Sequence, residues 1–152
     1  MKLRAATLDD LEMLLDHRVR MFREIGQTAT GELANVERVS REYFRRAIPG
    51  GGFHGVLAEW EGAGVVGGGG VVVAEWPGSA RRTMPRRPFI LNVYVEPAFR
   101  RRGIARAIME ELIGWCRAQG FDSICLHATE QGRPLYRQLG FVPTNEMRLD
   151  LR

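Results

Sequence analysis

Lysine, cysteine and long apolar runs are scarce in this chain of 152 residues. Lys2 is the only lysine, so arginine carries nearly all of the positive charge behind the net +4. Cys116 and Cys125 lack a CxxC spacing, which predicts reduced core thiols rather than a disulfide scaffold. No apolar run reaches the roughly 18 residues of a membrane span, and the N-terminal stretch has no apolar signal region. We therefore expect a cytoplasmic protein without a membrane partner.

Metal ligands are also sparse. The three histidines, His17, His54 and His127, lie far apart, and no group of side chains has ligand spacing. The expectation is that the protein holds no metal. The length predicts a single domain over residues 1–152, and a hydrophobic fraction of 45% suits a globular core.

Hydrophobic periodicity predicts an α/β fold in the order β-α-α-β-β-β-α-β-α-β. The expected architecture is a mixed central sheet with helices on both faces, in which the unit from Phe89 to Ala128 joins two parallel strands. The strand at 89–96 is apolar on both faces and is expected to be central. Strands are expected over 2–7, 53–60, 64–76, 89–96, 123–128 and 146–151, and helices over 8–25, 33–48, 104–119 and 132–140.

A G-x-G-x-x-G pattern, GAGVVG at 62–67, invites a dinucleotide-binding interpretation. That fingerprint requires a helix after the glycines, whereas three more glycines and three valines follow here. Each glycine costs a helix roughly 1 kcal/mol relative to alanine. The pattern therefore predicts a hairpin turn and a glycine-rich strand, in which close approach of another backbone or of a substrate would explain the glycines.

The segment from Val95 to Arg106, VEPAFRRRGIAR, has the features of a diphosphate-binding turn. A buried strand ends at Val95 and a helix begins near Gly103, and the first N–H groups of that helix have no partner within it. The helix dipole favours an anion at this place, and three consecutive arginines add positive charge. The alternative is a basic turn without a ligand. A Walker P-loop is excluded because no GK[ST] occurs.

Two segments resemble the signatures of the GCN5-related N-acetyltransferases (the GNAT family). In VEPAFRRRGIA, Arg100, Gly103 and Ala105 occupy the defining places of the acetyl-CoA signature, and PLYRQLGF at 134–141 resembles the second signature. The resemblance is specific from about Phe89 to Phe141. It implies the GNAT acyl-CoA N-acyltransferase fold, with acetyl-CoA as cosubstrate. It also implies direct transfer of the acetyl group to a primary amine in a ternary complex.

The resemblance also implies roles for particular residues. Backbone groups of Val93, Tyr94 and Val95 would bond the pantetheine arm and one of them would stabilise the oxyanion. The diphosphate would be held by Arg100, Arg101, Arg102, Gly103, Ile104, Ala105 and Arg106. Tyr136 falls on the tyrosine that protonates the departing thiolate, with a packing role as the alternative. Candidates for the general base are Glu24, Glu59, Glu75 and Glu130, with His127 and His54 behind them.

Partners and rival functions follow from the remaining features. Only eleven residues follow Phe141, where many family members have a β-hairpin, so a partner chain could supply the missing strand in a homodimer. The acceptor is expected to be a small-molecule or peptide amine, and the basic loop at 76–88 favours one with a carboxylate or phosphate. The alternatives are a non-catalytic acyl-CoA sensor and an RNA-associated module, including a toxin acting on charged tRNA. A nucleic-acid partner is not expected, because the aromatic residues fall in apolar stripes.

Overall fold

The computed structural model describes residues 1–27 and 29–151. Its elements are β1 (Lys2–Ala5), the 3-10 turn η1 (Leu8–Asp10), α1 (Leu11–Glu24), α2 (Thr30–Gly50), β2 (Phe53–Trp60), β3 (Gly64–Glu75), β4 (Arg86–Val95), the 3-10 turn η2 (Pro97–Phe99), α3 (Ile104–Ala118), β5 (Cys125–Leu126) and α4 (Arg133–Gln138). Helix α2 is longer at both ends than expected. It continues through Pro49 to a glycine cap at Gly51, whose φ is +76°.

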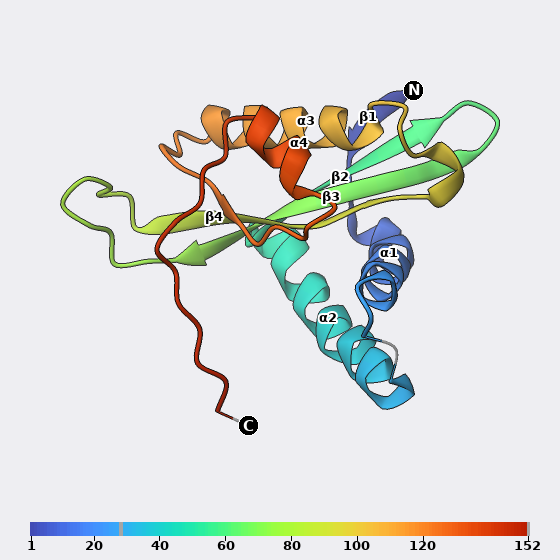
Figure 1. The fold of residues 1–152 in the computed structure, drawn as a ribbon, viewed down its shortest axis with the longest axis horizontal. Coiled ribbons are helices and arrows are strands. Elements are labelled where there is room, and N and C mark those ends of the chain that lie inside the picture. The colour runs from blue at the N-terminus through green and yellow to red at the C-terminus, as the bar shows by residue number, and fades with distance from the viewer. Residues whose placement is uncertain (28, 152) are drawn as a thin grey trace.

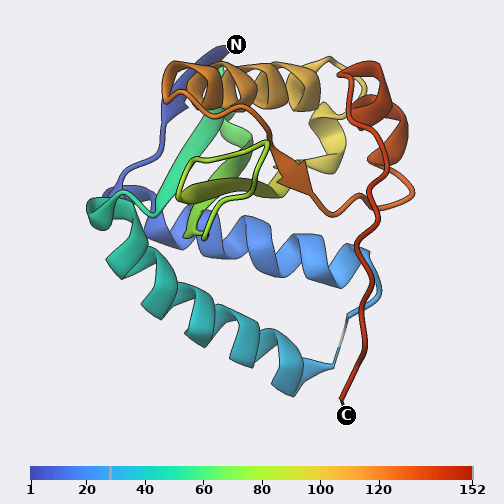
Figure 2. The same cartoon turned by 90° about the vertical axis from the view of Figure 1, so that its left-hand side faces the viewer.

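The five strands form one mixed sheet in the order β1-β2-β3-β4-β5. Neighbouring strands are antiparallel except β4 and β5, which are parallel. Helices α1 and α2 cover one face of this sheet, and α3 and α4 cover the other (Figures 1 and 2). The predicted α/β architecture, with helices on both faces, is therefore confirmed.

Each face of the sheet has its own apolar core. On one side the α3 stripe, including Ile108 and Leu112, is fully buried against β3 and β4. On the other side Leu14 of α1 and Phe44 of α2 pack on Phe53 and its neighbours. In each helix the apolar residues lie three and four positions apart and so share one face, and that face packs against the sheet.

Four consecutive glycines, at 67–70, allow β3 to lie unusually close to its neighbours. A Cβ on Gly67 would lie 2.7 Å from the carbonyl oxygen of Tyr94 on β4. A Cβ on Gly70 would overlap the ring of Phe53 on β2. Close approach by neighbouring strands therefore explains the glycine run, and the dinucleotide-binding interpretation is not needed.

The C-terminal segment differs from the expectation. Residues 142–151 have no helix or strand, so the strand predicted at 146–151 is wrong, and β5 is shorter than predicted. The alternating pattern of Met147, Leu149 and Leu151 is typical of a strand, but these side chains are 94%, 81% and 90% exposed. A strand forms only where its backbone finds a partner, and the segment runs past the sheet without pairing to it (Figure 1).

The described residues contain neither a membrane-spanning helix nor a cluster of metal ligands. None of their helices combines the length and apolar character needed to cross a bilayer. Nor do residues 1–27 and 29–151 bring three or more His, Cys, Asp or Glu side chains together as metal ligands.

Candidate active site

A cleft of about 1080 Å³ opens where β4 and β5 separate. The two strands pair only at Phe89 with Cys125 and at Ile90 with Leu126, so the rest of β4 has an open edge. The cleft is lined by residues of α1 on one side of the sheet and of α3 and α4 on the other. It therefore passes through the sheet between the two helical layers seen in Figure 2.

A bulge shapes the open edge of β4. Asn92 and Val93 together lie opposite Gly69, and Asn92 takes a left-handed backbone with φ +62°. The Asn92 side chain is buried, and its Nδ2 donates a hydrogen bond to the carbonyl of Leu14 on α1, at 3.3 Å. Asparagine tolerates this φ better than most residues, which accounts for a polar residue in the middle of an apolar strand.

The hydrogen bonds at the end of β4 show which backbone groups face the cleft. Glu96 N–H donates to Val66 on β3, whereas the carbonyl of Val95 faces away from β3 and accepts a bond from Arg100. Successive residues of a strand direct their backbone groups to opposite edges. The N–H groups of Val93 and Val95 therefore point toward the open side. All three residues predicted to bond the pantetheine arm, 93–95, line the cleft.

The turn before α3 exposes backbone N–H groups at the same cleft. Arg101 and Gly103 both have left-handed backbones, with φ of +61° and +78°. The first N–H used inside the helix is that of Ala107, which bonds Gly103 at 3.0 Å. The N–H groups of residues 104–106 precede it and have no intrahelical acceptor. A Cβ on Gly103 would meet no described atom within 4 Å apart from its immediate chain surroundings, so glycine is needed here for the left-handed φ and not for close packing.

The arginines of this turn differ in what their side chains contact. The Nε of Arg100 donates to Val95 O, and its Nη2 contacts both carboxylate oxygens of Glu24, at 2.6 and 2.8 Å. Arg102 lies over the rings of Trp60 and Phe99 and does not line the cleft. Within the predicted set, Arg101 and Arg106 are the arginines that line the cleft without a bond to Glu24.

Tyr136 enters the cleft from α4. Its ring packs across Gly132, where a Cβ would lie 2.7 Å from the ring. Burial raises the pKa of the Tyr136 phenol above its ordinary value, so the hydroxyl keeps its proton at neutral pH. The arrangement can supply a proton to a group in the cleft.

The four candidate carboxylates fall in different places. Glu24 lines the cleft in its ion pair with Arg100. Glu130 also lines it, although its side chain is 89% exposed and contacts Arg133 at 3.0 Å. Glu59 and Glu75 do not line it.

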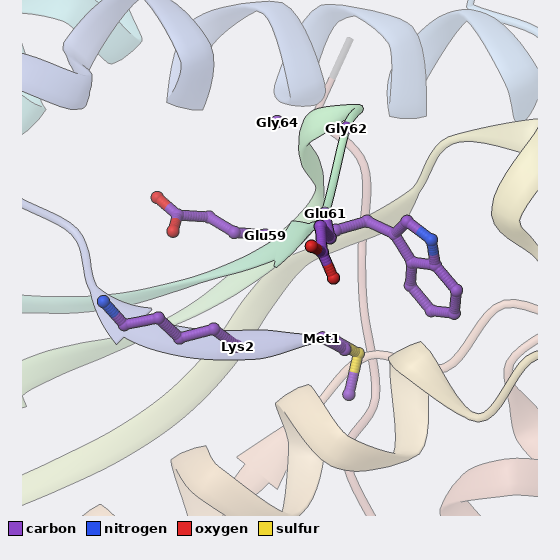
Figure 3. Close-up of a pocket in the computed structure, with 7 residues that line it drawn as sticks. Met1, Lys2, Glu59, Glu61, Gly62 and Gly64 are labelled. Atoms are coloured by element: carbon purple, nitrogen blue, oxygen red, sulfur yellow. The ribbon is translucent and has the colours of Figure 1, made fainter.

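Glu59 lies instead in a separate hollow of about 460 Å³. This hollow is formed by the N-terminus and the turn between β2 and β3, and Figure 3 shows Glu59 on β2 next to the strand that carries Lys2. The Glu59 carboxylate bonds Arg4 at 2.6 Å. Glu75 is exposed at the far end of β3.

The two histidines that were secondary candidates for the general base also lie in different places. His54 stacks on Trp115 of α3, with ring centroids 4.3 Å apart, and lies outside the cleft. His127 lines the cleft and contacts Glu146 at 2.8 Å. The basic loop at 76–88 contributes no residue to the cleft wall.

Two residues of α1 were missed by sequence reasoning. His17 is buried against the ring of Tyr94, and burial lowers the pKa of its imidazole to about 4, which keeps the ring neutral. Arg18 lines the cleft, and its Nε donates to Ser40 on α2 at 2.9 Å. A signal existed, because Arg18 lies four residues after the buried Leu14 and so falls on the apolar face of the helix.

Comparison with known proteins agrees with this geometry. Residues 11–141 match the Acetyltransferase (GNAT) family. A glucosamine 6-phosphate N-acetyltransferase from Trypanosoma brucei brucei is 35% identical over 63 residues, which span 41% of this chain and 43% of that protein. The alignment thus covers less than half of that relative.

Solved structures match over almost the whole chain. A GCN5-related N-acetyltransferase from Ralstonia eutropha JMP134 superposes with a TM-score of 0.91 and 35% identity, over 99% of this chain and 97% of that one. A predicted acetyltransferase from Clostridium acetobutylicum, solved with acetyl-CoA, has a TM-score of 0.90 and 24% identity, over 99% of this chain and 96% of that one. The chain belongs to the GNAT family of acetyltransferases.

Proposed function

We propose that the protein transfers the acetyl group of acetyl-CoA directly to a primary amine within a ternary complex. The observation that carries the proposal is the cleft itself. It brings together the open edge of β4, the N–H groups at the start of α3 that have no intrahelical acceptor, and the half-buried phenol of Tyr136. Membership of the GNAT family supports the same reaction.

In this proposal the donor extends along β4 toward the bulge. Its pantetheine arm adds to the edge at Val93–Val95 as another strand would. Its diphosphate lies at the first turn of α3, where the N–H groups of Ile104 to Arg106 and the helix dipole favour an anion. Arg101 and Arg106 supply guanidinium groups there. Arg100 contributes chiefly by fixing the turn, because its guanidinium already bonds Val95 and Glu24.

The chemistry requires an oxyanion donor, an acid and a base. The neutral amine attacks the thioester carbonyl, and the N–H of Val93 stabilises the oxyanion that develops. Collapse of the tetrahedral intermediate breaks the C–S bond, and Tyr136 donates its proton to the departing sulfur. The amine loses its own proton to a base. Glu24 and Glu130 remain candidates for that base because they are the predicted carboxylates that line the cleft.

Calorimetry and an acyl-transfer assay test the proposal together. Acetyl-CoA is expected to bind, and at least one member of a panel of small-molecule and peptide amines is expected to release free thiol. The panel includes glucosamine 6-phosphate because the trypanosomal relative bears that name. Absence of both heat and thiol would overturn the proposal. Heat without thiol for any amine would instead favour the non-catalytic sensor.

We also propose that the C-terminal segment pairs with a second copy of the chain. Val142, Met147, Leu149 and Leu151 are 76% to 94% exposed, and the outer edge of β5 has no strand beside it among the described residues. An exposed edge and an apolar extended segment are suited to pair. Light scattering should give the mass of a dimer, and deletion after Phe141 should give a monomer. A full-length monomer would contradict this proposal.

A further inference from the structure

Arg18 is a cation in the cleft wall without an acidic partner among the described residues. Its Nε bonds the hydroxyl of Ser40, and its guanidinium lies over the ring of Phe22, 4.9 Å from the ring centroid. Neither neighbour carries charge. No carboxylate of residues 1–27 or 29–151 lies within ion-pair distance of it, and its Nη groups have no acceptor in that part of the chain.

This situation differs from that of the other cleft arginines. Arg100 bonds Glu24, and Arg106 contacts Gln138 and Glu110. Arg101 is exposed and remains hydrated. Burial lowers the pKa of Arg18, in agreement with a guanidinium that has lost water without gaining a carboxylate. Arg18 is half-buried, and a charge that has lost part of its water without gaining an ionic partner is costly, so this one is suited to receive an anion.

The position of Arg18 separates it from the diphosphate turn. It lies one turn of α1 beyond Leu14, whose carbonyl bonds Asn92 at the bulge, which is a rise of about 6 Å. Glu24, which holds Arg100 beside the α3 turn, lies about 9 Å further along the same helix. The bond to Ser40 also holds Arg18 toward α2, in the helical layer opposite α3 and α4 (Figure 2).

We propose that Arg18 binds an anionic group of the acceptor, a carboxylate or a phosphate, while the amine of the same molecule faces the bulge of β4. The inference rests on the proposed acetyltransferase function, because it assigns the substrate class of that site. The planar guanidinium suits either anion, since two of its N–H groups can bond two oxygens of one group. The bond to Ser40 and the contact with Phe22 fix the plane in which those N–H groups lie.

Matched amines test the inference in the transfer assay. O-phosphoethanolamine is compared with ethanolamine, and β-alanine with its amide. The anionic member of at least one pair should have a kcat/KM about 10- to 100-fold higher than its neutral counterpart, the range expected for a hydrogen bond to a charged group. Arg18→Met should remove this preference, mainly by raising KM. Arg23→Met, an exposed arginine of α1 outside the cleft, should retain it.

A second measurement does not depend on turnover. With the protein saturated by coenzyme A, inorganic phosphate is titrated by calorimetry into wild type, Arg18→Met and Arg23→Met. The expected result is binding that Arg18→Met abolishes and Arg23→Met keeps. Binding by wild type that is lost in Arg18→Met would support the anion site even if no amine were acetylated.

Three other outcomes would contradict anion binding by Arg18. Equal acetylation of anionic and neutral amines would overturn the inference while leaving the acetyltransferase function in place. A preference or a phosphate titration that persists unchanged in Arg18→Met would overturn it as well. Absence of both an anion preference and phosphate binding in wild type would also overturn the inference.

Discussion

Replacing Gly67 by alanine should disturb both the stability of the fold and the donor half of the cleft. The added Cβ would lie 2.7 Å from Tyr94 O and 3.2 Å from a methyl group of Val95, where ordinary contacts begin near 3.4 Å. The close atom belongs to the backbone, so β4 must move by roughly 0.7 Å, the difference between these distances. Such overpacking typically costs about 1–3 kcal/mol of unfolding free energy. For a chain of this size that is a Tm lower by roughly 2–12 °C.

The measurement is thermal unfolding with and without acetyl-CoA, together with the Kd of acetyl-CoA. Gly114→Ala is the matched control, because Gly114 is an exposed helical position where a Cβ meets nothing within 4 Å. That control should raise the Tm slightly, since alanine is favoured in a helix by about 1 kcal/mol. The Gly67 variant should also bind acetyl-CoA more weakly, because the strand that moves is the one that borders the cleft. A variant with wild-type Tm and wild-type Kd would refute the argument that close packing of β3 fixes β4.

Three further predictions follow from the site and its surroundings. Gly103→Glu places a carboxylate where the diphosphate is proposed to bind, at the N-terminus of α3, and strains a residue with φ +78°. Calorimetry should therefore show the affinity for acetyl-CoA reduced at least about tenfold. An unchanged affinity would count against the diphosphate site. Tyr136→Phe should reduce kcat by about 100-fold in the thiol-release assay with the Kd of acetyl-CoA unchanged, whereas an unchanged kcat would leave Tyr136 only a packing role. The Arg4 guanidinium lowers the pKa of Asp10 to about 2 in the folded protein. The contribution of this ion pair to the free energy of unfolding is therefore complete above the ordinary pKa of 3.8 and is lost as pH falls toward 2. Asp10→Asn should lose this pH dependence in denaturant unfolding between pH 2 and 5, and parallel curves for the two proteins would contradict the pairing.

Local sequence signals were sufficient for most of the fold. The strand at 53–60 was predicted to the residue, and the helix beginning at 104 was misplaced only at its end, because apolar periodicity and glycine caps mark these boundaries. The geometry of the turn before α3 was predictable for the same reason, since its residues are contiguous and their backbone is set by Gly103 and the start of a helix; diphosphate binding there stays a prediction.

Features that depend on distant contacts were beyond these signals. The pairing of Arg100 with Glu24 joins residues 76 positions apart, so sequence alone assigned one to the donor and the other to the base. The same limitation left Glu59 among the base candidates, although folding places it with Arg4 in another hollow. The predicted C-terminal strand failed because alternation specifies which side chains share a face and does not supply a neighbouring strand.

A cleft that crosses the sheet has a consequence for how the two proposed substrates would be recognised. Its walls on opposite layers are built from different helices, and Gly103 and Arg18 share no hydrogen-bond or ion-pair partner among the described residues. Free-energy changes at sites without common contacts generally add. Under the proposed function, substitutions in α1 and α2 would change the choice of amine while the proposed coenzyme A contacts of β4 and α3 stay the same.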